Sequence, residues 1–113
     1  MITIKTPGRR KGHVMEENRE KTGQRVYRVA LDDIGSRKEL HERLRRDLPL
    51  PDYYGGNLDA FYDVLTEFGN GWDVRFTGCG PLREILPAYM NALTGLCRHA
   101  VEEMENLTIT FED

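Results

Sequence analysis

The sequence predicts a small α/β domain with a three-stranded parallel sheet, about four helices and an N-terminal extension. Three segments alternate between apolar and polar residues as strands do, namely Val26–Leu31, Trp72–Phe76 and Leu107–Phe111. Residues at helical spacing fill the two intervals between them, and each interval has room for two helices. Strands joined by helical crossovers pair in parallel. The 113 residues suffice for one domain with a modest core.

The first helix is predicted to follow the strand at Val26–Leu31, after a turn at Asp32-Asp33. Ser36 and Glu39 have the spacing of a capping box, in which the serine caps the helix and the glutamate reaches back. Pro49 ends the helix because it lacks a backbone N–H and disfavours helix in the residue before it. Three leucines at helical spacing form its buried stripe: Leu40, Leu44 and Leu48.

A second helix is predicted to start after Asn57, a favourable N-cap, and to end at the Gly69-Asn70-Gly71 turn. Its first turn contains Asp59, which the helix dipole favours there. The helix has two stripes. The inner stripe comprises Leu58, Phe61, Tyr62 and Leu65, and the outer stripe comprises Asp59, Asp63 and Glu67.

The second crossover follows the strand at Trp72–Phe76, where Trp72 is expected to belong to the core. Pro81 is predicted to be the first residue of a short third helix that ends before Pro87. A longer fourth helix leads into the last strand. Its apolar positions at helical spacing are Tyr89, Leu93, Leu96 or Cys97, Ala100 and Met104.

Residues 1–24 are interpreted as a basic extension, and residues 25–113 as the compact domain. Residues 1–23 contain six Lys or Arg against three Glu, and turn formers are frequent among them. Met1–Lys5 is compatible with an edge strand. The Arg9-Arg10-Lys11 run is interpreted as part of a solvated, flexible arm in preference to a binding patch. The extension is therefore expected to be dispensable for folding.

Composition excludes several classes of protein. Charged residues make up 31% and hydrophobic residues 39% of the chain, and no apolar run approaches the roughly 20 residues of a membrane helix. Residues 24–113 contain ten Lys or Arg against sixteen Asp or Glu, which disfavours direct contact with nucleic acid. Cys79 and Cys97 do not have the spacing of metal ligands, and two cysteines are too few for a disulfide scaffold. A cytoplasmic protein without a metal or cofactor is expected.

The strongest functional signal is an acidic stretch. Between Arg46 and Arg75 there is no Lys, Arg or His, whereas six carboxylates occur there. Asp59 and Asp63 lie four residues apart, so they share one helix face, where like charges repel by a few tenths of a kcal/mol. A surface that meets a positively charged partner accounts for this arrangement. A merely solvated helix face is the alternative.

An enzymatic interpretation is also open. Asp59 and Asp63 could act as a catalytic acid and base, or could bind a metal together with His99. The segment has no His or Cys and no phosphate-binding loop, and Cys79 lacks a paired histidine, so we expect no enzymatic activity.

From about Val26 to the C-terminus the chain resembles the barstar family of intracellular ribonuclease inhibitors. The resemblance rests on Leu50–Thr66, which reads LPDYYGGNLDAFYDVLT. The Ser36–Leu48 helix, its Asp-Leu-Pro-Leu-Pro ending and the closing Leu-Thr-Ile strand agree with it. It implies the barstar fold and a monomer that blocks the active site of a barnase-like or related small ribonuclease, as the immunity protein of a toxic enzyme. The alternative is an acidic protein-binding module of the same fold whose basic partner is not a ribonuclease.

The resemblance also implies which residues bind the ribonuclease, with Asp63 as the main anchor among the catalytic cations. Two positions depart from the family. Tyr62 replaces a tryptophan, and His99 replaces a glutamate, while Glu103 matches a second family glutamate one turn further on. Neither cysteine matches a family cysteine, so no redox property is implied. The predicted partner-binding residues are Tyr53, Tyr54, Gly55, Asn57, Leu58, Asp59, Tyr62, Asp63, His99 and Glu103.

Overall fold

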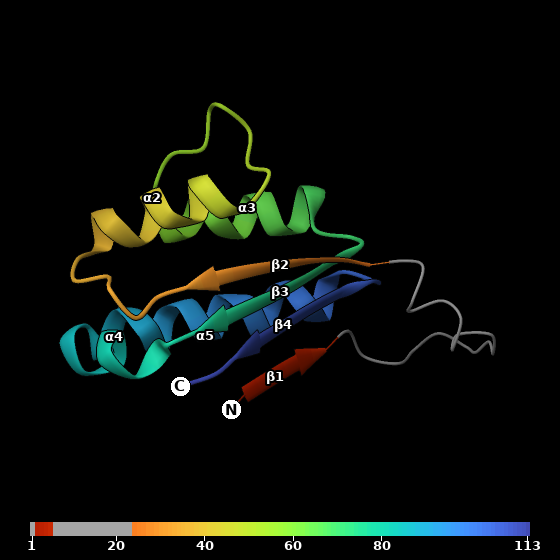
Figure 1. Ribbon diagram of the computed structural model, residues 1–113. Helices are drawn as coiled ribbons and strands as arrows, with labels where there is room; N and C mark the ends of the chain where they lie inside the picture. Colours follow the sequence, from red (N-terminus) through yellow and green to blue (C-terminus); the bar gives the residue numbers. More distant parts are fainter. Residues whose placement is uncertain (1, 6–23) are drawn as a thin grey trace.

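The computed structural model describes residues 2–5 and 24–113 and contains one four-stranded sheet with the order β1-β4-β3-β2 (Figure 1). Three neighbouring strands of this sheet pair in parallel, which confirms the predicted parallel sheet. They are β2 (Arg25–Ala30), β3 (Trp72–Thr77) and β4 (Leu107–Phe111). The fourth strand, β1 (Ile2–Lys5), pairs antiparallel with β4 at one edge. The edge strand that the sequence allowed within Met1–Lys5 is present at Ile2–Lys5.

Two helices fill each crossover, as predicted. The first crossover contains α2 (Arg37–Asp47) and α3 (Leu58–Phe68), and the second contains α4 (Cys79–Ile85) and α5 (Pro87–Glu103). Both crossovers step from one strand to its neighbour in the same direction, so right-handed connections place the helices on the same face of the sheet. Figure 1 views the opposite face, with α5 passing behind β3 and β4. No helix among the described residues is long and apolar enough to cross a membrane.

The core lies between the sheet and the helices. Every second side chain of β4 is buried, beginning with Leu107, and the threonines between them are half-buried. Register brings residues of three strands into rows, such as Val29, Phe76 and Phe111. The rings of Phe76 and Phe111 stack with centroids 4.9 Å apart. Trp72 is buried, as predicted.

The first turn of α2 confirms the predicted cap and adds one detail. Ser36 Oγ accepts a hydrogen bond from the Glu39 backbone N–H at 3.1 Å. Glu39 reaches back as a capping box requires, but its carboxylate accepts from the backbone N–H of Gly35 at 2.7 Å and not from that of Ser36. The three predicted leucines of this helix are buried: Leu40, Leu44 and Leu48.

The start of α4 differs from the prediction. The helix begins at Cys79, two residues before Pro81, and Gly78 is its N-cap with φ 65°. Pro81 is thus the third residue of α4, where the missing N–H costs nothing because the first N–H groups of a helix have no intrahelical acceptor. A Cβ at position 78 would lie 2.7 Å from the Asp32 Cβ, so both conformation and space require glycine there.

The strand β1 changes what we expect from truncation. It pairs with β4 from Ile2 opposite Phe111 to Lys5 opposite Thr108. Deleting residues 1–5 is expected to lower the free energy of unfolding by about 1–3 kcal/mol, since each net hydrogen bond contributes about 1 kcal/mol. Urea denaturation of the full-length and truncated chains measures this loss. Equal stability of the two chains would instead support the dispensability that the sequence suggested.

Candidate partner-binding surface

The acidic face of α3 is presented on a well-capped helix. Asn57 Oδ1 accepts a hydrogen bond from the Ala60 backbone N–H at 2.8 Å, which fixes the first turn. The inner face is buried through Phe61, Val64 and Leu65. Because that face is held by the core, the opposite face stays in solvent. Its three carboxylates are exposed: Asp59, Asp63 and Glu67.

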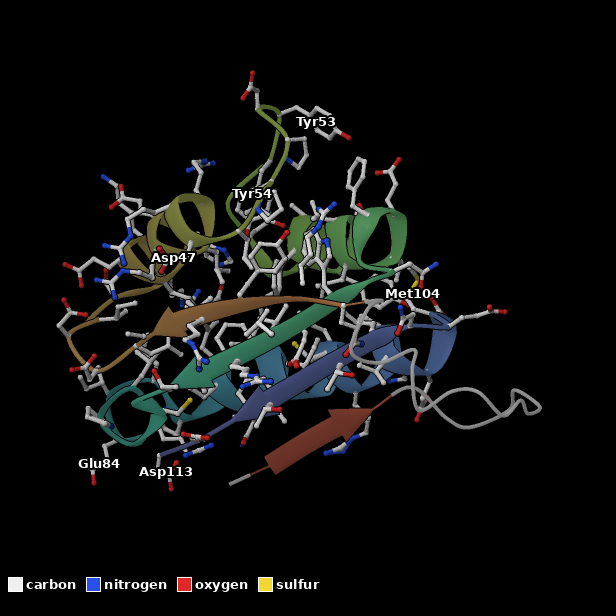
Figure 2. The ribbon with its side chains drawn as sticks, turned by 45° about the vertical axis from the view of Figure 1, so that its right-hand side comes forward. Asp47, Tyr53, Tyr54, Glu84, Met104 and Asp113 are labelled. Carbon is white, nitrogen blue, oxygen red and sulfur yellow. The ribbon has the colours of Figure 1, made fainter. Side chains whose placement is uncertain are left out.

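The loop of residues 49–57 separates the two predicted tyrosine contacts. Tyr53 is 71% exposed near the tip of the loop, whereas only 4% of Tyr54 is exposed. Figure 2 shows Tyr53 pointing away from the molecule and Tyr54 lying between the loop and the helices. Tyr53 is thus free to contact a partner, while Tyr54 belongs to the support beneath the loop.

The glycine pair of the loop also divides into two roles. Gly56 has φ 75°, a left-handed conformation that favours glycine. Gly55 has no such requirement, and a Cβ there would make only ordinary contacts, the nearest with Ala60 Cβ at 3.5 Å. Gly55 is exposed, so its backbone is open to an approaching chain. The predicted contact residue Gly55 therefore lies on the surface, and Gly56 shapes the turn.

Helix α5 carries the two remaining predicted residues, His99 and Glu103. The two helices pack together, and a hydrogen bond to the Glu103 carboxylate is the main cause that raises the pKa of the Tyr62 phenol. The charge of Asp63 acts in the same direction. His99 is exposed one turn before Glu103 on the same face of α5. The structure therefore places Tyr62, Asp63 and Glu103 side by side, with Leu58 and Tyr62 half-buried.

One residue that supports this surface was missed by the sequence analysis. His41 of α2 is buried, and its two ring nitrogens contact the hydroxyls of Tyr54 and Tyr89. It stands directly after Leu40 and three residues before Leu44, so helical spacing placed it beside the buried stripe. That spacing was the sequence signal that the His41 side chain is buried. The partner of His41 could not be read from it, because Tyr54 lies in an irregular loop.

Among residues 24–113, none of the ion pairs involves Asp59 or Asp63, so their charges have no cationic partner within that part of the domain. The described residues hold no group of three His, Cys, Asp or Glu that could bind a metal. Burial raises the pKa of both the Cys79 and the Cys97 thiols, which disfavours a thiolate nucleophile.

Fold and surface together define a small α/β domain that presents an exposed acidic helix and an aromatic loop beside it. Residues 24–112 match the family model described as Barstar (barnase inhibitor). The chain belongs to the barstar family, and the resemblance stated from the sequence is confirmed.

A curated relative from Bacillus subtilis (strain 168) carries the name "Putative ribonuclease inhibitor YrdF". It is 48% identical to this chain over 40 residues, which are 35% of this chain and 40% of the relative. The matched segment covers less than half of the relative's own length, and the individual contact residues stay predictions.

Proposed function

We propose that this protein is a cytoplasmic inhibitor of a barnase-like or related small ribonuclease, and that α3 and the loop before it block the active site. The observation that carries the proposal is the pair of exposed carboxylates, Asp59 and Asp63, on a rigid capped helix with no cationic partner among residues 24–113. The like-charged pair gains its stabilisation only when a positive surface covers it.

A ribonuclease active site concentrates cationic side chains that bind RNA phosphates. A carboxylate fixed on a helix satisfies such groups with charge-assisted hydrogen bonds, which are about twice as strong as neutral ones. Asp63 would enter the centre of the cleft, with Asp59 and Glu103 nearer the rim. Tyr53 and the exposed backbone at Gly55 would contact the wall of the cleft. The free inhibitor would be a monomer that protects the producing cell from the toxic enzyme.

The experiment is a titration of small secreted ribonucleases with the protein, measuring RNA hydrolysis and stopped-flow binding. Stoichiometric loss of hydrolysis is expected. The association rate should fall steeply with added salt, because the screening length shrinks from about 30 Å at 0.01 M to about 8 Å at 0.15 M. The dissociation rate should change much less.

Two outcomes would contradict this function. Binding that leaves RNA hydrolysis intact would place the docking surface outside the nuclease cleft. Absence of binding to every ribonuclease, together with capture of another basic protein by the same surface, would favour an acidic binding module of different purpose. The control for both is the Asp59→Asn, Asp63→Asn double variant, which keeps the shape of the helix and removes two of its three negative charges.

His99 provides a separate prediction about specificity. It is exposed on α5 where the family has a glutamate. His99→Glu is expected to bind a barnase-type ribonuclease several-fold more tightly, because it adds a negative charge that faces a positive cleft. Equal affinities of the two proteins would show that His99 lies outside the interface.

A further inference from the structure

The loop that carries Tyr53 is held from inside the molecule by one histidine. His41 is only 3% exposed. Its Nδ1 lies 2.5 Å from the Tyr54 hydroxyl oxygen, and its Nε2 lies 2.7 Å from the Tyr89 hydroxyl oxygen. These three side chains come from α2, the loop and α5. His41 therefore connects the loop to two helices of the core through a single ring.

Tyr54 is the point at which the loop is attached. Its backbone N–H donates to the Pro51 carbonyl at 3.0 Å, and its own carbonyl accepts from Arg45 Nη2 at 2.8 Å. The Arg45 guanidinium also lies over the Tyr54 ring, 5.3 Å from its centre. Tyr53 is adjacent in the chain, and the Asn57 cap of α3 follows three residues later. Release of the Tyr54 side chain would thus free both the aromatic tip and the entry to the acidic helix.

The neutral imidazole suits this position. A neutral histidine has one N–H and one acceptor nitrogen, so it donates to one tyrosine oxygen and accepts from the other hydroxyl. A protonated histidine has two N–H groups, and the hydroxyl that donated to it must turn its hydrogen elsewhere. The groups that face the ring are the hydroxyls of Tyr54 and Tyr89 and the cation of Arg45. Arg37 adds a second cation over the Tyr89 ring, 4.8 Å from its centre.

We propose that His41 is a positioning residue for the partner-binding surface, and that its protonation in mildly acidic solution releases the loop of residues 49–57. The consequence for the ribonuclease rests on the proposed function above, whereas the release of the loop is a property of the free protein. The attached loop is the form that binds a partner, because Tyr53 and Asn57 then have fixed positions. The released loop binds weakly, because ordering it opposes binding.

The direction of the pH effect follows from the environment of the ring. Burial, and then the charge of Arg45, lower the pKa of His41 below its ordinary value of 6.5. A lowered pKa means that the attached state binds the proton less well than the released state. The contribution of His41 is therefore complete above pH 6.5 and is lost as the pH falls through the lower pKa of the attached state.

The test is hydrogen exchange of backbone amides in the free, full-length protein between pH 8 and pH 5, corrected for the intrinsic pH dependence. The reporter is the Tyr54 amide, and amides of β3 and β4 report the core. We expect protection of the Tyr54 amide to fall about fivefold in acid, which is the ratio for one net hydrogen bond, while the core stays protected. Tyr54→Phe should show the reduced protection at every pH. His41→Gln, which cannot gain a proton, should show no pH dependence.

Tyr27→Phe is the matched control, since it removes a tyrosine hydroxyl on β2, away from the loop, and should leave the profile unchanged. Constant protection of the wild-type Tyr54 amide from pH 8 to pH 5 would overturn the proposal, as would an unchanged Tyr54→Phe. If His41→Gln does not fold, the wild-type pH titration and the Tyr54→Phe variant still decide between the outcomes.

Ribonuclease affinity measured on the same samples separates the two proposals. Inhibition with a pH-insensitive loop would refute the role of His41 alone, and a responsive loop without inhibition would refute the ribonuclease assignment alone.

Discussion

Asp63→Ala is expected to weaken binding of the cognate ribonuclease by about 2–5 kcal/mol. This is the usual cost of removing one partner of a buried charge pair, and the barnase–barstar complex is one of the examples from which that range comes. Asp63 is exposed in the free protein and lies beside Tyr62, where the packed helices α3 and α5 meet. Burial of that position against the nuclease removes water from the carboxylate and from the cations around it. Removing the carboxylate then leaves those cations buried without a partner. Isothermal titration calorimetry measures the loss.

The order of effects on one helix face tests the docking model more sharply. Asp63→Ala should cost more affinity than Asp59→Ala, and both should cost more than Glu67→Ala, which lies one turn further from the loop. All three variants should remain folded, because each removes a surface charge that lies four residues from a like charge. Wild-type affinity of Asp63→Ala would show that this face of α3 does not enter the nuclease cleft.

Phe61→Ala is expected to lower the free energy of unfolding by about 3–5 kcal/mol, a large part of the stability of a domain of this size. The Phe61 side chain is completely buried on the inner face of α3. Its truncation removes apolar contacts and leaves a cavity that the surrounding helices and sheet fill only in part. The measurement is urea denaturation followed by circular dichroism.

Phe68 provides the matched control, because it lies on the same helix and is 43% exposed. Phe68→Ala should cost less, about 1–2 kcal/mol, since nearly half of the Phe68 side chain stays in water in the folded protein. Similar losses for the two variants would mean that the inner face of α3 is not packed as the structure shows.

The sequence was sufficient for those features that depend on neighbours in the chain. Alternation predicted the three parallel strands, and capping residues such as Ser36 and Asn57 predicted the helix starts, because an N-cap acts on the next three residues. The position of α4 was wrong by two residues, because Gly78 has a left-handed conformation that residue identity alone does not reveal. The acidic stripe of α3 was predicted from spacing, which places Asp59 and Asp63 on one face in any helix.

Only the tertiary structure decided which of two adjacent tyrosines faces the solvent. Their residue type is the same, and their loop has no periodic pattern, so the choice depends on a partner distant in the chain. That partner is His41, thirteen residues before Tyr54 and forty-eight before Tyr89. In the same way, packing of α5 on α3 brought Glu103 to Tyr62, and the antiparallel pairing with β4 gave Ile2–Lys5 their place in the sheet. Contacts of this kind form between segments that only the folded chain brings together, and sequence spacing carries no measure of their distance.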